Sequence, residues 1–246
     1  MSFSEAWLRQ REPYDHQARS VPLVRRFAEA VGRGRVLDLG GGLGSGARFL
    51  RRHAPALDVW VVDHDEALLE AAAAEGLDTL RADLRAVDWP EADGLHCQAL
   101  LDLVSWSWLD GFVERLARRP VPLLATLTVD GRVDFDPVDP DDAEVMAAFR
   151  EHQRLDRGFG ASPGPEAAQV LGARLERAGW EVAWARADWR VPATDRAMVS
   201  AMVAGIVEAA AEMSARPERV RAWGERRAGA LTVGHLDLLA LPPSSG

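Results

Sequence analysis

The residues best suited to ligand chemistry form the run Val36-Leu37-Asp38-Leu39-Gly40-Gly41-Gly42-Leu43-Gly44. Apolar residues interrupted by one acid and followed by clustered glycines indicate a buried strand that ends in a tight turn. The next residues, Ser45 to His53, have the pattern of a helix, so a parallel strand passes here into a crossover helix. Glycine allows the positive φ of such a turn and a close approach of the backbone to a ligand. The pattern therefore predicts a nucleoside-binding turn.

Two further acids follow at the ends of the next two predicted strands. The run Asp58-Val59-Trp60-Val61-Val62-Asp63 ends in a carboxylate 19 residues after Gly44, and Leu80-Arg81-Ala82-Asp83-Leu84 contains another. In doubly wound folds an acid at the end of the second strand accepts hydrogen bonds from ribose hydroxyls. Asp83, at the end of the third strand, could meet an adenine edge.

These motifs resemble those of the class I S-adenosylmethionine-dependent methyltransferases, specifically the small-molecule, type 11/12-like enzymes. Asp38, the D-L-G-G-G-L-G run, the V-V-D ending at Asp63 and the A-D-L around Asp83 match that family's first three motifs in order and spacing. The resemblance covers about residues 36–99 and implies S-adenosylmethionine as the cofactor. Gly41 departs from the pattern, because many relatives carry Cys or another small residue there.

The resemblance also implies roles for individual residues. The glycines would line the methionine part of the cofactor, Asp63 would hold the ribose and Asp83 the adenine amino group. The implied cofactor-binding set is Asp38, Gly40, Gly41, Gly42, Gly44, Asp63, His64, Asp83, Leu84, Ala99 and Leu100.

A dinucleotide site is the main alternative, because Gly42-Leu43-Gly44-Ser45-Gly46-Ala47 satisfies G-x-G-x-x-G/A. Asp38 argues against it, since a carboxylate beside the turn repels a pyrophosphate but suits a cationic amino or sulfonium group. Glycines that only permit a tight turn are a second alternative. That reading does not explain why three acids fall at three successive strand ends.

Methyl transfer from a sulfonium is an in-line displacement, so catalysis is mainly positioning, and a base is needed only if the acceptor must lose a proton. His152 and Asp156 are four residues apart and would share a helix face as an acceptor-binding or proton-accepting pair. A solvated helix end is the plain alternative for them. The residues expected on the acceptor side are Tyr14, Arg19, Asp102, Trp106 and Gln153. Three of them have a specific structural alternative: Asp102 could cap the next helix, Trp106 could pack on the sheet, and Tyr14 could belong to a turn.

Other chemistries find less support. No Asn/Asp-Pro-Pro-aromatic run follows the fourth predicted strand, which argues against methylation of exocyclic base amines or glutamine amides. Cys97-Gln98 is similar to the Cys-Gln pair of cytosine-C5 methyltransferases, but it lies inside an apolar strand and follows His96 rather than proline. Cys97 is therefore interpreted as a buried small residue. Histidines and the cysteine are not at metal-ligand spacing, so no metal site is predicted.

The composition fits a cytoplasmic globular protein of 246 residues. The net charge is −9, and all 29 basic side chains are arginine, so neither nucleic acid nor an anionic membrane is expected as a partner. A single cysteine rules out an internal disulfide, and no signal peptide or membrane span is expected. The arginine bias is interpreted as the mark of a GC-rich genome. The sequence leaves the oligomeric state open, with a homodimer as one option.

Alternation of strands and helices predicts a doubly wound, mostly parallel seven-stranded sheet in one domain, residues 1–246. An N-terminal cap of two helices, broken at Pro13 and Pro22, would cover residues 1–30. A substrate-side insertion is expected at 136–165 and a helical insertion at 192–227. The late strands are a hairpin turning at Asp130-Gly131, a sixth strand over 180–189 and a last one over 231–241, one of them antiparallel.

Within this fold, the segment 136–165 is expected to close over the acceptor, with His152 facing the pocket. The predicted function is methyl transfer to a small molecule. The alternatives are a protein methyltransferase, an NAD(P)-dependent oxidoreductase and a non-catalytic regulator that binds S-adenosylmethionine.

Overall fold

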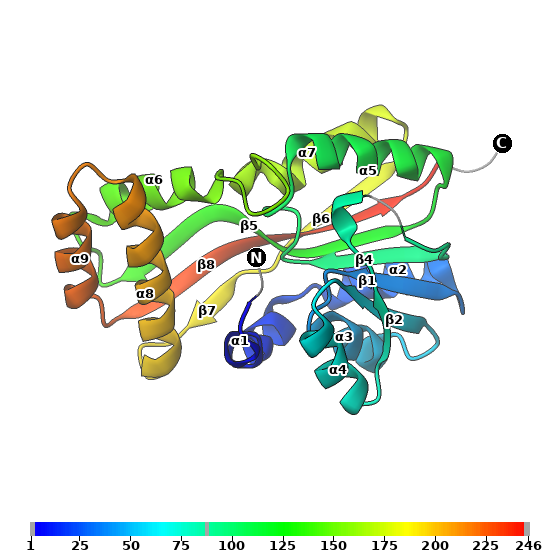
Figure 1. Ribbon diagram of the computed structural model, residues 1–246, viewed down its shortest axis with the longest axis horizontal. Helices are drawn as coiled ribbons and strands as arrows, with labels where there is room; N and C mark the ends of the chain where they lie inside the picture. Colours follow the sequence, from blue (N-terminus) through cyan, green and yellow to red (C-terminus); the bar gives the residue numbers. More distant parts are fainter. Residues whose placement is uncertain (1–2, 87–88, 244–246) are drawn as a thin grey trace.

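The computed structural model describes residues 3–86 and 89–243 (Figure 1). Its strands, in chain order, are β1 (Arg35–Leu39), β2 (Asp58–Asp63), β3 (Asp78–Arg81), β4 (Gly94–Gln98), β5 (Leu123–Asp136), β6 (Glu181–Arg186), β7 (Trp189–Val191) and β8 (Ala230–Leu241). The sheet order is β3-β2-β1-β4-β5-β8-β6, and the short strand β7 also pairs with β8.

The strands β1 to β5 are parallel to their neighbours, whereas β8 is antiparallel to β5, β6 and β7. The predicted doubly wound, mostly parallel sheet is confirmed, including the antiparallel late strand. The path from β3 to β6 contains the seven expected strands, and β7 is an additional eighth.

Helices cover both faces of the sheet, because strands buried on both sides expose apolar residues above and below. The helices are α1 (Glu5–Ala18), α2 (Val21–Val31), α3 (Ser45–His53), α4 (Glu66–Ala74), α5 (Trp106–Arg118), α6 (Asp142–Gln153), α7 (Ala167–Arg177), α8 (Arg196–Met213) and α9 (Pro217–Arg226), with short 3-10 turns η1 (Leu84–Ala86) and η2 (Gly164–Glu166). One apolar cluster joins the sheet to α5 and α7, and another joins it to α2, α3 and α4. No helix of the described ranges is long and apolar enough to cross a bilayer.

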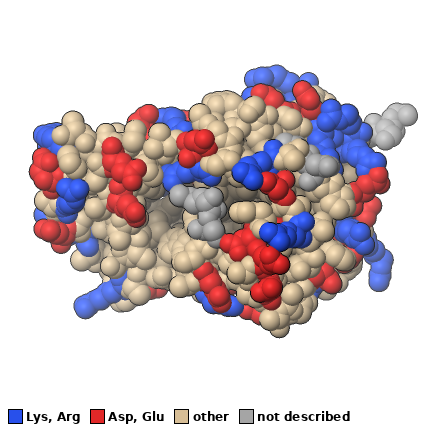
Figure 2. Space-filling model, in the orientation of Figure 1, with Lys and Arg blue, Asp and Glu red and all other residues tan. Residues whose placement is uncertain are grey.

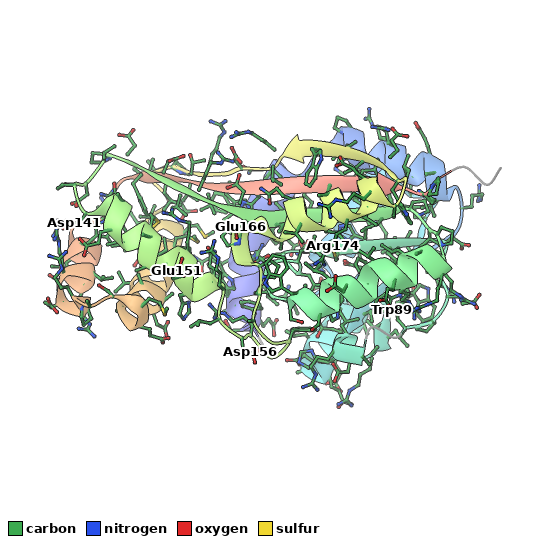
Figure 3. The ribbon with its side chains drawn as sticks, turned by 90° about the horizontal axis from the view of Figure 1, so that it is seen from above. Trp89, Asp141, Glu151, Asp156, Glu166 and Arg174 are labelled. Atoms are coloured by element: carbon green, nitrogen blue, oxygen red, sulfur yellow. The ribbon has the colours of Figure 1, made fainter. Side chains whose placement is uncertain are left out.

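Strands β5 and β8 are much longer than the others and run beyond the parallel core (Figure 1). Their extended ends, with β7, form a third apolar cluster with α6, α8 and α9. The expected helical insertion at 192–227 is thus confirmed as α8 and α9. Viewed from above, α6 lies over the extension, while α5 and α7 lie over the core (Figure 3).

The predicted hairpin at Asp130-Gly131 is wrong. Strand β5 continues through this point, and only its register with β8 shifts between Val129 and Val133. Gly131 has a φ of +81°, and the Asp130 carboxylate accepts a hydrogen bond from the Arg132 N–H at 3.0 Å. The dipeptide therefore makes a bulge within a strand, because pairing of Val133 with Val233 continues beyond it.

Two other boundaries differ from the prediction. Pro13 lies inside α1 rather than ending it, while Pro22 is in the first turn of α2 as expected. Trp7 and Tyr14, on the two sides of Pro13, both contact the Trp189 ring, with centroid separations of 6.4 and 6.2 Å. This shared packing offsets the backbone hydrogen bond that proline removes from the helix.

The predicted sixth strand is divided into β6 and β7. The break falls at Ala187 and Asp188, where the Asp188 carboxylate accepts hydrogen bonds from Arg132 at 2.8 Å and from the His235 N–H at 3.3 Å.

Candidate cofactor and acceptor site

A cavity of about 210 Å³ opens at the carboxyl ends of β1 to β4, where ligands of doubly wound folds bind. Backbone and side chains from α1, the strand ends, and the loop after α6 form its wall. The lining residues are Phe3, Leu8, Arg11, Gly40, Gly41, Gly42, Asp63, His64, Asp65, Leu68, Asp83, Leu84, Arg85, Gln98, Ala99, Leu100, Leu103, Arg157, Gly158 and Phe159. On the face shown in Figure 2, acidic and basic side chains are interspersed.

The glycine turn forms one wall of this cavity. Gly40 and Gly42 have φ values of +67° and +51°, and the N–H groups of Gly40 and Gly41 donate to the Val62 carbonyl. A Cβ at Gly41 would lie 2.9 Å from a carboxylate oxygen of Asp38. The turn therefore needs glycine both for its backbone angles and for its closeness to the strand beneath.

Gly44 has a different reason to be glycine. It adopts a φ of +80° as the N-cap of α3, and it does not line the cavity. A Cβ there would lie 2.2 Å from a methyl group of Leu77. Packing of the helix against the sheet explains this residue, and direct contact with a ligand is not needed.

Asp63 binds the glycine turn from the neighbouring strand. Its Oδ2 accepts from the Gly42 N–H at 2.9 Å, and its Oδ1 accepts from the N–H groups of His64 at 2.7 Å and Asp65 at 3.0 Å. A carboxylate has about four lone-pair sites, so these bonds leave capacity for a ligand hydroxyl. His64 lies on the wall beside it, with its Nδ1 3.1 Å from Asp63.

Asp83 lies on the wall but is already paired. Its two oxygens accept hydrogen bonds from the Arg85 guanidinium at 2.5 to 2.9 Å. This pairing lowers the pKa of the carboxyl to about 2. The predicted contact with an adenine amino group would therefore compete with Arg85. Leu84, Ala99 and Leu100, to which the resemblance gives a cofactor-binding role, also line the cavity.

Asp38 does not reach the cavity, contrary to its expected place beside the ligand. It is fully buried beneath the turn, where its Oδ1 lies 2.7 Å from His96 Nδ1. The other imidazole nitrogen lies 3.2 Å from the Thr126 hydroxyl. Because Asp38 points down from β1, it supports the turn from below, and the methionine group would meet Gly40 to Gly42 instead.

The predicted pair of His152 and Asp156 does not form. His152 Nε2 lies 3.2 Å from Glu212 on α8, and the Arg157 guanidinium donates to its Nδ1 at 2.7 Å. Asp156 is exposed, and its carboxylate accepts hydrogen bonds from the backbone of Gly158 and Gly160 (Figure 3). These bonds lower the pKa of Asp156. Neither residue lines the cavity, because α6 ends before the loop turns inward.

Three predicted acceptor-side residues have structural roles. The Tyr14 hydroxyl donates to Asp195 at 2.6 Å, and burial, followed by this bond, raises its pKa to about 12. Arg19 is buried and donates to the Ser45 carbonyl at 3.3 Å, which supports the start of α3. Trp106 is 46% exposed at the start of α5. None of them lines the cavity.

Asp102 and Gln153 belong to the segments that form the wall, but neither residue lines the cavity itself. Each has a buried side-chain oxygen, Asp102 Oδ1 and Gln153 Oε1, without a hydrogen-bond partner among the described residues. The two segments are joined through Ser162, whose hydroxyl donates to the Asp102 carbonyl at 2.7 Å and whose N–H donates to the Arg154 carbonyl.

Two arginines of the wall are absent from the predicted set of site residues. Arg11 comes from α1, and Arg157 from the loop after α6. Leu8, three residues before Arg11, would contact a Cβ at Gly42 at 3.4 Å, so this face of α1 covers the turn. The spacing of Leu8 and Arg11 was visible in the sequence, but nothing in it showed that α1 lies over the sheet edge.

The cysteine is buried, as interpreted from the sequence. Cys97 lies in the apolar cluster under α5, and burial raises the pKa of its thiol far above the usual range. A thiol held in this way is a poor nucleophile.

No protein-family model matches the sequence, and no curated protein sequence matches it. Among solved structures, a cyclopropane-fatty-acyl-phospholipid synthase-like protein from Lactobacillus casei has a TM-score of 0.56 at 14% identity, with 94% of this chain and 99% of that chain covered. Human N-acetylserotonin methyltransferase in complex with SAM has a TM-score of 0.47 at 16% identity and 95% coverage of this chain. A putative sarcosine dimethylglycine methyltransferase from Galdieria sulphuraria has a TM-score of 0.48 at 16% identity, covering 92% of this chain and 84% of its own.

The chain spans about half the length of the first of these methyltransferases, 52%. At such identities the likeness concerns the fold. The match with the synthase-like protein shows a shared fold, and the sheet order with its antiparallel β8 is that of the predicted doubly wound, mostly parallel sheet of methyltransferase type.

Proposed function

We propose that this protein transfers a methyl group from S-adenosylmethionine to a small-molecule acceptor. The observation that carries the proposal is the hydrogen bond between Asp63 and the Gly42 N–H on the wall of the cavity. This hydrogen bond connects an acid that suits ribose hydroxyls with a turn whose backbone a ligand can approach closely. Both lie at the carboxyl edge of a sheet with the methyltransferase strand order.

The residues of the wall fit the parts of this cofactor. Gly40 to Gly42 form a cradle that a Cβ would fill. The Arg11 guanidinium, held by Asp15 at 3.1 Å, also lines the cavity and suits the carboxylate of the methionine part. Asp63 suits the ribose. Leu84 and Leu100 provide apolar surface for the adenine ring near Asp83. When bound, the cofactor supplies an electrophilic methyl group on a sulfonium.

The acceptor would enter on the side of β4 and β5. In the sheet, β2 and β3 lie on one side of β1, where the adenosine would bind by this proposal, and β4 and β5 lie on the other side. There the wall consists of Gln98, Leu103, Arg157 and Phe159, and the Phe159 ring packs edge-on to Trp108 at 6.2 Å. A small cavity closed by a loop suits a small molecule better than a protein segment. The chain's contribution to the reaction is to hold the acceptor in line and to exclude water.

Binding and transfer test the proposal. S-adenosylhomocysteine at about 100 times its dissociation constant should add roughly 2.7 kcal/mol of stability, measured by thermal melting. NADH and NADPH should leave the melting temperature unchanged. A shift with NADH or NADPH but none with S-adenosylhomocysteine would instead support an oxidoreductase.

Transfer is measured with S-adenosylmethionine carrying a labelled methyl group and a panel of small phenols, amines and carboxylic acids, with bulk protein as the comparison. Label should appear in a small molecule. Label in protein would identify a protein methyltransferase, and binding without transfer to any acceptor would favour a regulator.

A further inference from the structure

Asp102 is placed between two residues of the cavity wall. It lies in the turn after β4, with Leu100 two positions before it and Leu103 directly after it, and both of these line the cavity. Its Oδ1 is buried and has no hydrogen-bond partner in the described part of the chain. A buried oxygen without a donor is costly, so it is typical of a group that a ligand completes.

The alternative role for Asp102, capping the next helix, is taken by another residue. Ser105 is the N-cap of α5, and its hydroxyl accepts a hydrogen bond from the Trp108 N–H at 3.1 Å. The backbone carbonyl of Asp102 accepts a hydrogen bond from the Ser162 hydroxyl, but within residues 3–86 and 89–243 no group donates to its carboxylate Oδ1. The side chain is therefore not needed to build this part of the fold.

The titratable groups around Asp102 come from three elements. Burial is the largest effect and raises the pKa of its carboxyl to about 6, while its own N–H and the charges of Arg11 and Arg157 act in the opposite direction. Arg11 belongs to α1 and Arg157 to the loop after α6, and both line the cavity. On β4, the thiol of Cys97 has its pKa raised further by the Asp102 charge.

We propose that Asp102 accepts the proton that the acceptor loses on methylation, so that the acceptor is a molecule whose nucleophilic oxygen or nitrogen carries a hydrogen. This inference rests on the proposed function. The acceptor O–H or N–H donates to Asp102 Oδ1, which has no donor among the described residues. As the acceptor lone pair takes the methyl group, the proton passes to Oδ1, and the electron pair of the broken carbon–sulfur bond stays with the sulfur.

The proposal selects among acceptor classes. Phenols, alcohols and neutral primary or secondary amines carry an O–H or N–H proton that is lost as the methyl group is taken up, and they would use Asp102. Carboxylic acids are already ionised near neutral pH and offer no hydrogen to Oδ1. The nearby guanidinium groups favour the ionised form of Asp102, which is the form that takes a proton.

The first experiment needs no acceptor. The carboxyl resonances of ¹³C-labelled aspartate are titrated in the chain saturated with S-adenosylhomocysteine, and the Asp102 signal is identified by its loss in Asp102→Asn. A pKa near 6 is expected. A value near the ordinary one of about 3.9 overturns the proposal. Asp102→Asn should retain its affinity for S-adenosylhomocysteine, which separates this test from failure of the cofactor proposal.

The second experiment measures methyl transfer to phenols and secondary amines. Asp102→Asn should lower kcat by roughly 10² to 10⁴ fold, as expected for loss of a general base. In the unmodified chain kcat/KM should rise with pH up to about 6 and then level off. The control is Asp110→Asn, which removes an exposed carboxylate on α5, paired with Arg174 at 3.0 Å, and should leave transfer unchanged.

Unchanged turnover in Asp102→Asn, or transfer to carboxylic acids alone, would overturn the proposal. If no acceptor of the panel is methylated, the titration decides by itself.

Discussion

The Asp63 carboxylate accepts a hydrogen bond from the Gly42 N–H at 2.9 Å, so the acid that ends β2 also holds the turn that ends β1. The same carboxylate accepts from the N–H groups of His64 and Asp65. A residue first interpreted as a ribose ligand alone therefore also shapes the site. Binding and local stability are coupled at this position.

Replacing Asp63 tests that coupling. Asp63→Ala should weaken S-adenosylhomocysteine binding by about 1.5–3 kcal/mol, the range for hydrogen bonds to a charged group. It should also lower the melting temperature of the free protein, because three backbone N–H groups lose their acceptor. Calorimetric titration and thermal melting measure the two effects separately.

Asp58→Ala is the matched control, because it changes an acid at the opposite end of the same strand. Asp58 is exposed and pairs with Arg35 at 3.3 Å, outside the cavity. This variant should bind S-adenosylhomocysteine normally. Equal affinity of Asp63→Ala and Asp58→Ala would remove Asp63 from the binding site.

Gly46 should tolerate no side chain. A Cβ there would lie 2.6 Å from an Asp38 oxygen and 2.7 Å from the His96 ring. Gly46→Ala should therefore cost roughly 1–3 kcal/mol of unfolding free energy, as overpacking does. Gly205→Ala is the control, since Gly205 is also helical but a Cβ there meets nothing within 4 Å. It should stabilise the chain by up to about 1 kcal/mol. Urea unfolding compares them, and equal stabilities would contradict the packing argument.

The sequence predicted the parallel core well, because each of its elements has a local pattern. The strand before Gly40 and the strand before Asp63 are apolar runs bounded by turn residues, and both are present within a residue of their expected limits. The prediction of a hairpin at Asp130-Gly131 was wrong because the same residue types, Asp followed by Gly, occur in both β-bulges and tight turns. Only the pairing of Val133 with Val233, a contact between distant parts of the chain, distinguishes them.

The site was predictable only where it depends on local sequence. Asp63 and the glycine turn follow from a strand and the turn after it. Arg11 and Arg157 reach the cavity because α1 and the loop after α6, which are distant in the sequence, both lie at the sheet edge, and no local pattern shows that. The predicted pairing of His152 with Asp156 was wrong because it also depends on a distant contact. His152 pairs with Glu212, sixty residues away on α8, rather than with the nearby Asp156.

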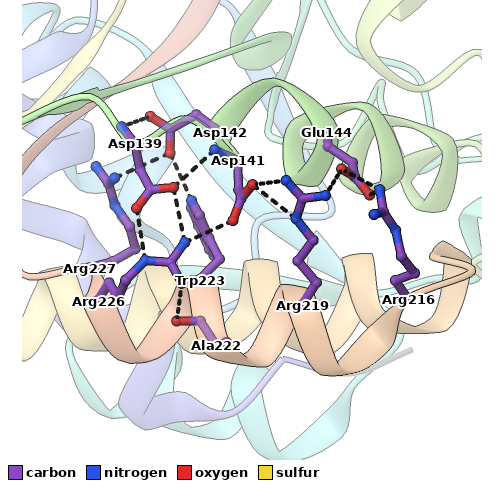
Figure 4. A network of polar contacts seen from close by, with 10 residues as sticks. All are labelled: Asp139, Asp141, Asp142, Glu144, Arg216, Arg219, Ala222, Trp223, Arg226 and Arg227. Carbon is purple, nitrogen blue, oxygen red and sulfur yellow. Dashed lines mark hydrogen bonds and ion pairs between the residues drawn. The ribbon is translucent and has the colours of Figure 1, made fainter.

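A network of ion pairs joins α9 to the residues that begin α6 (Figure 4). Arg226 donates to Asp139 at 3.0 Å and to Asp141 at 2.8 Å, while Arg219 pairs with Asp141 and Glu144. Arg226→Ala should lower the urea midpoint, and the loss should shrink in high salt, because ions screen the pairs in the unmodified chain. Arg118→Ala, at an exposed helix pair, should have little effect.

The acid side of this network gives a pH test. The Arg226 guanidinium lowers the pKa of Asp139 to about 2. Since the folded pKa lies below the unfolded value of about 3.9, its stabilisation is complete above that value and is lost as pH falls towards 2. The stability difference between the unmodified chain and Arg226→Ala should therefore narrow over this range. A difference that stays constant down to pH 2 would exclude the pairing as its cause.

His235 should make the fold less stable in mild acid. It is buried beside Trp189, with ring centroids 4.9 Å apart, and burial together with the charge of Arg11 lowers its pKa to about 3. The unfolded chain binds a proton at this residue below pH of about 6.5, whereas the folded chain does not until about 3. Stability should thus fall as pH decreases through this window, by at most about 1.4 kcal/mol per pH unit. In His235→Gln the contribution of His235 to the pH dependence of stability should disappear. His64→Gln, which replaces an exposed histidine, should retain that contribution. Urea unfolding at several pH values measures it, and parallel curves for His235→Gln and the unmodified chain would show that His235 is protonated in the folded state.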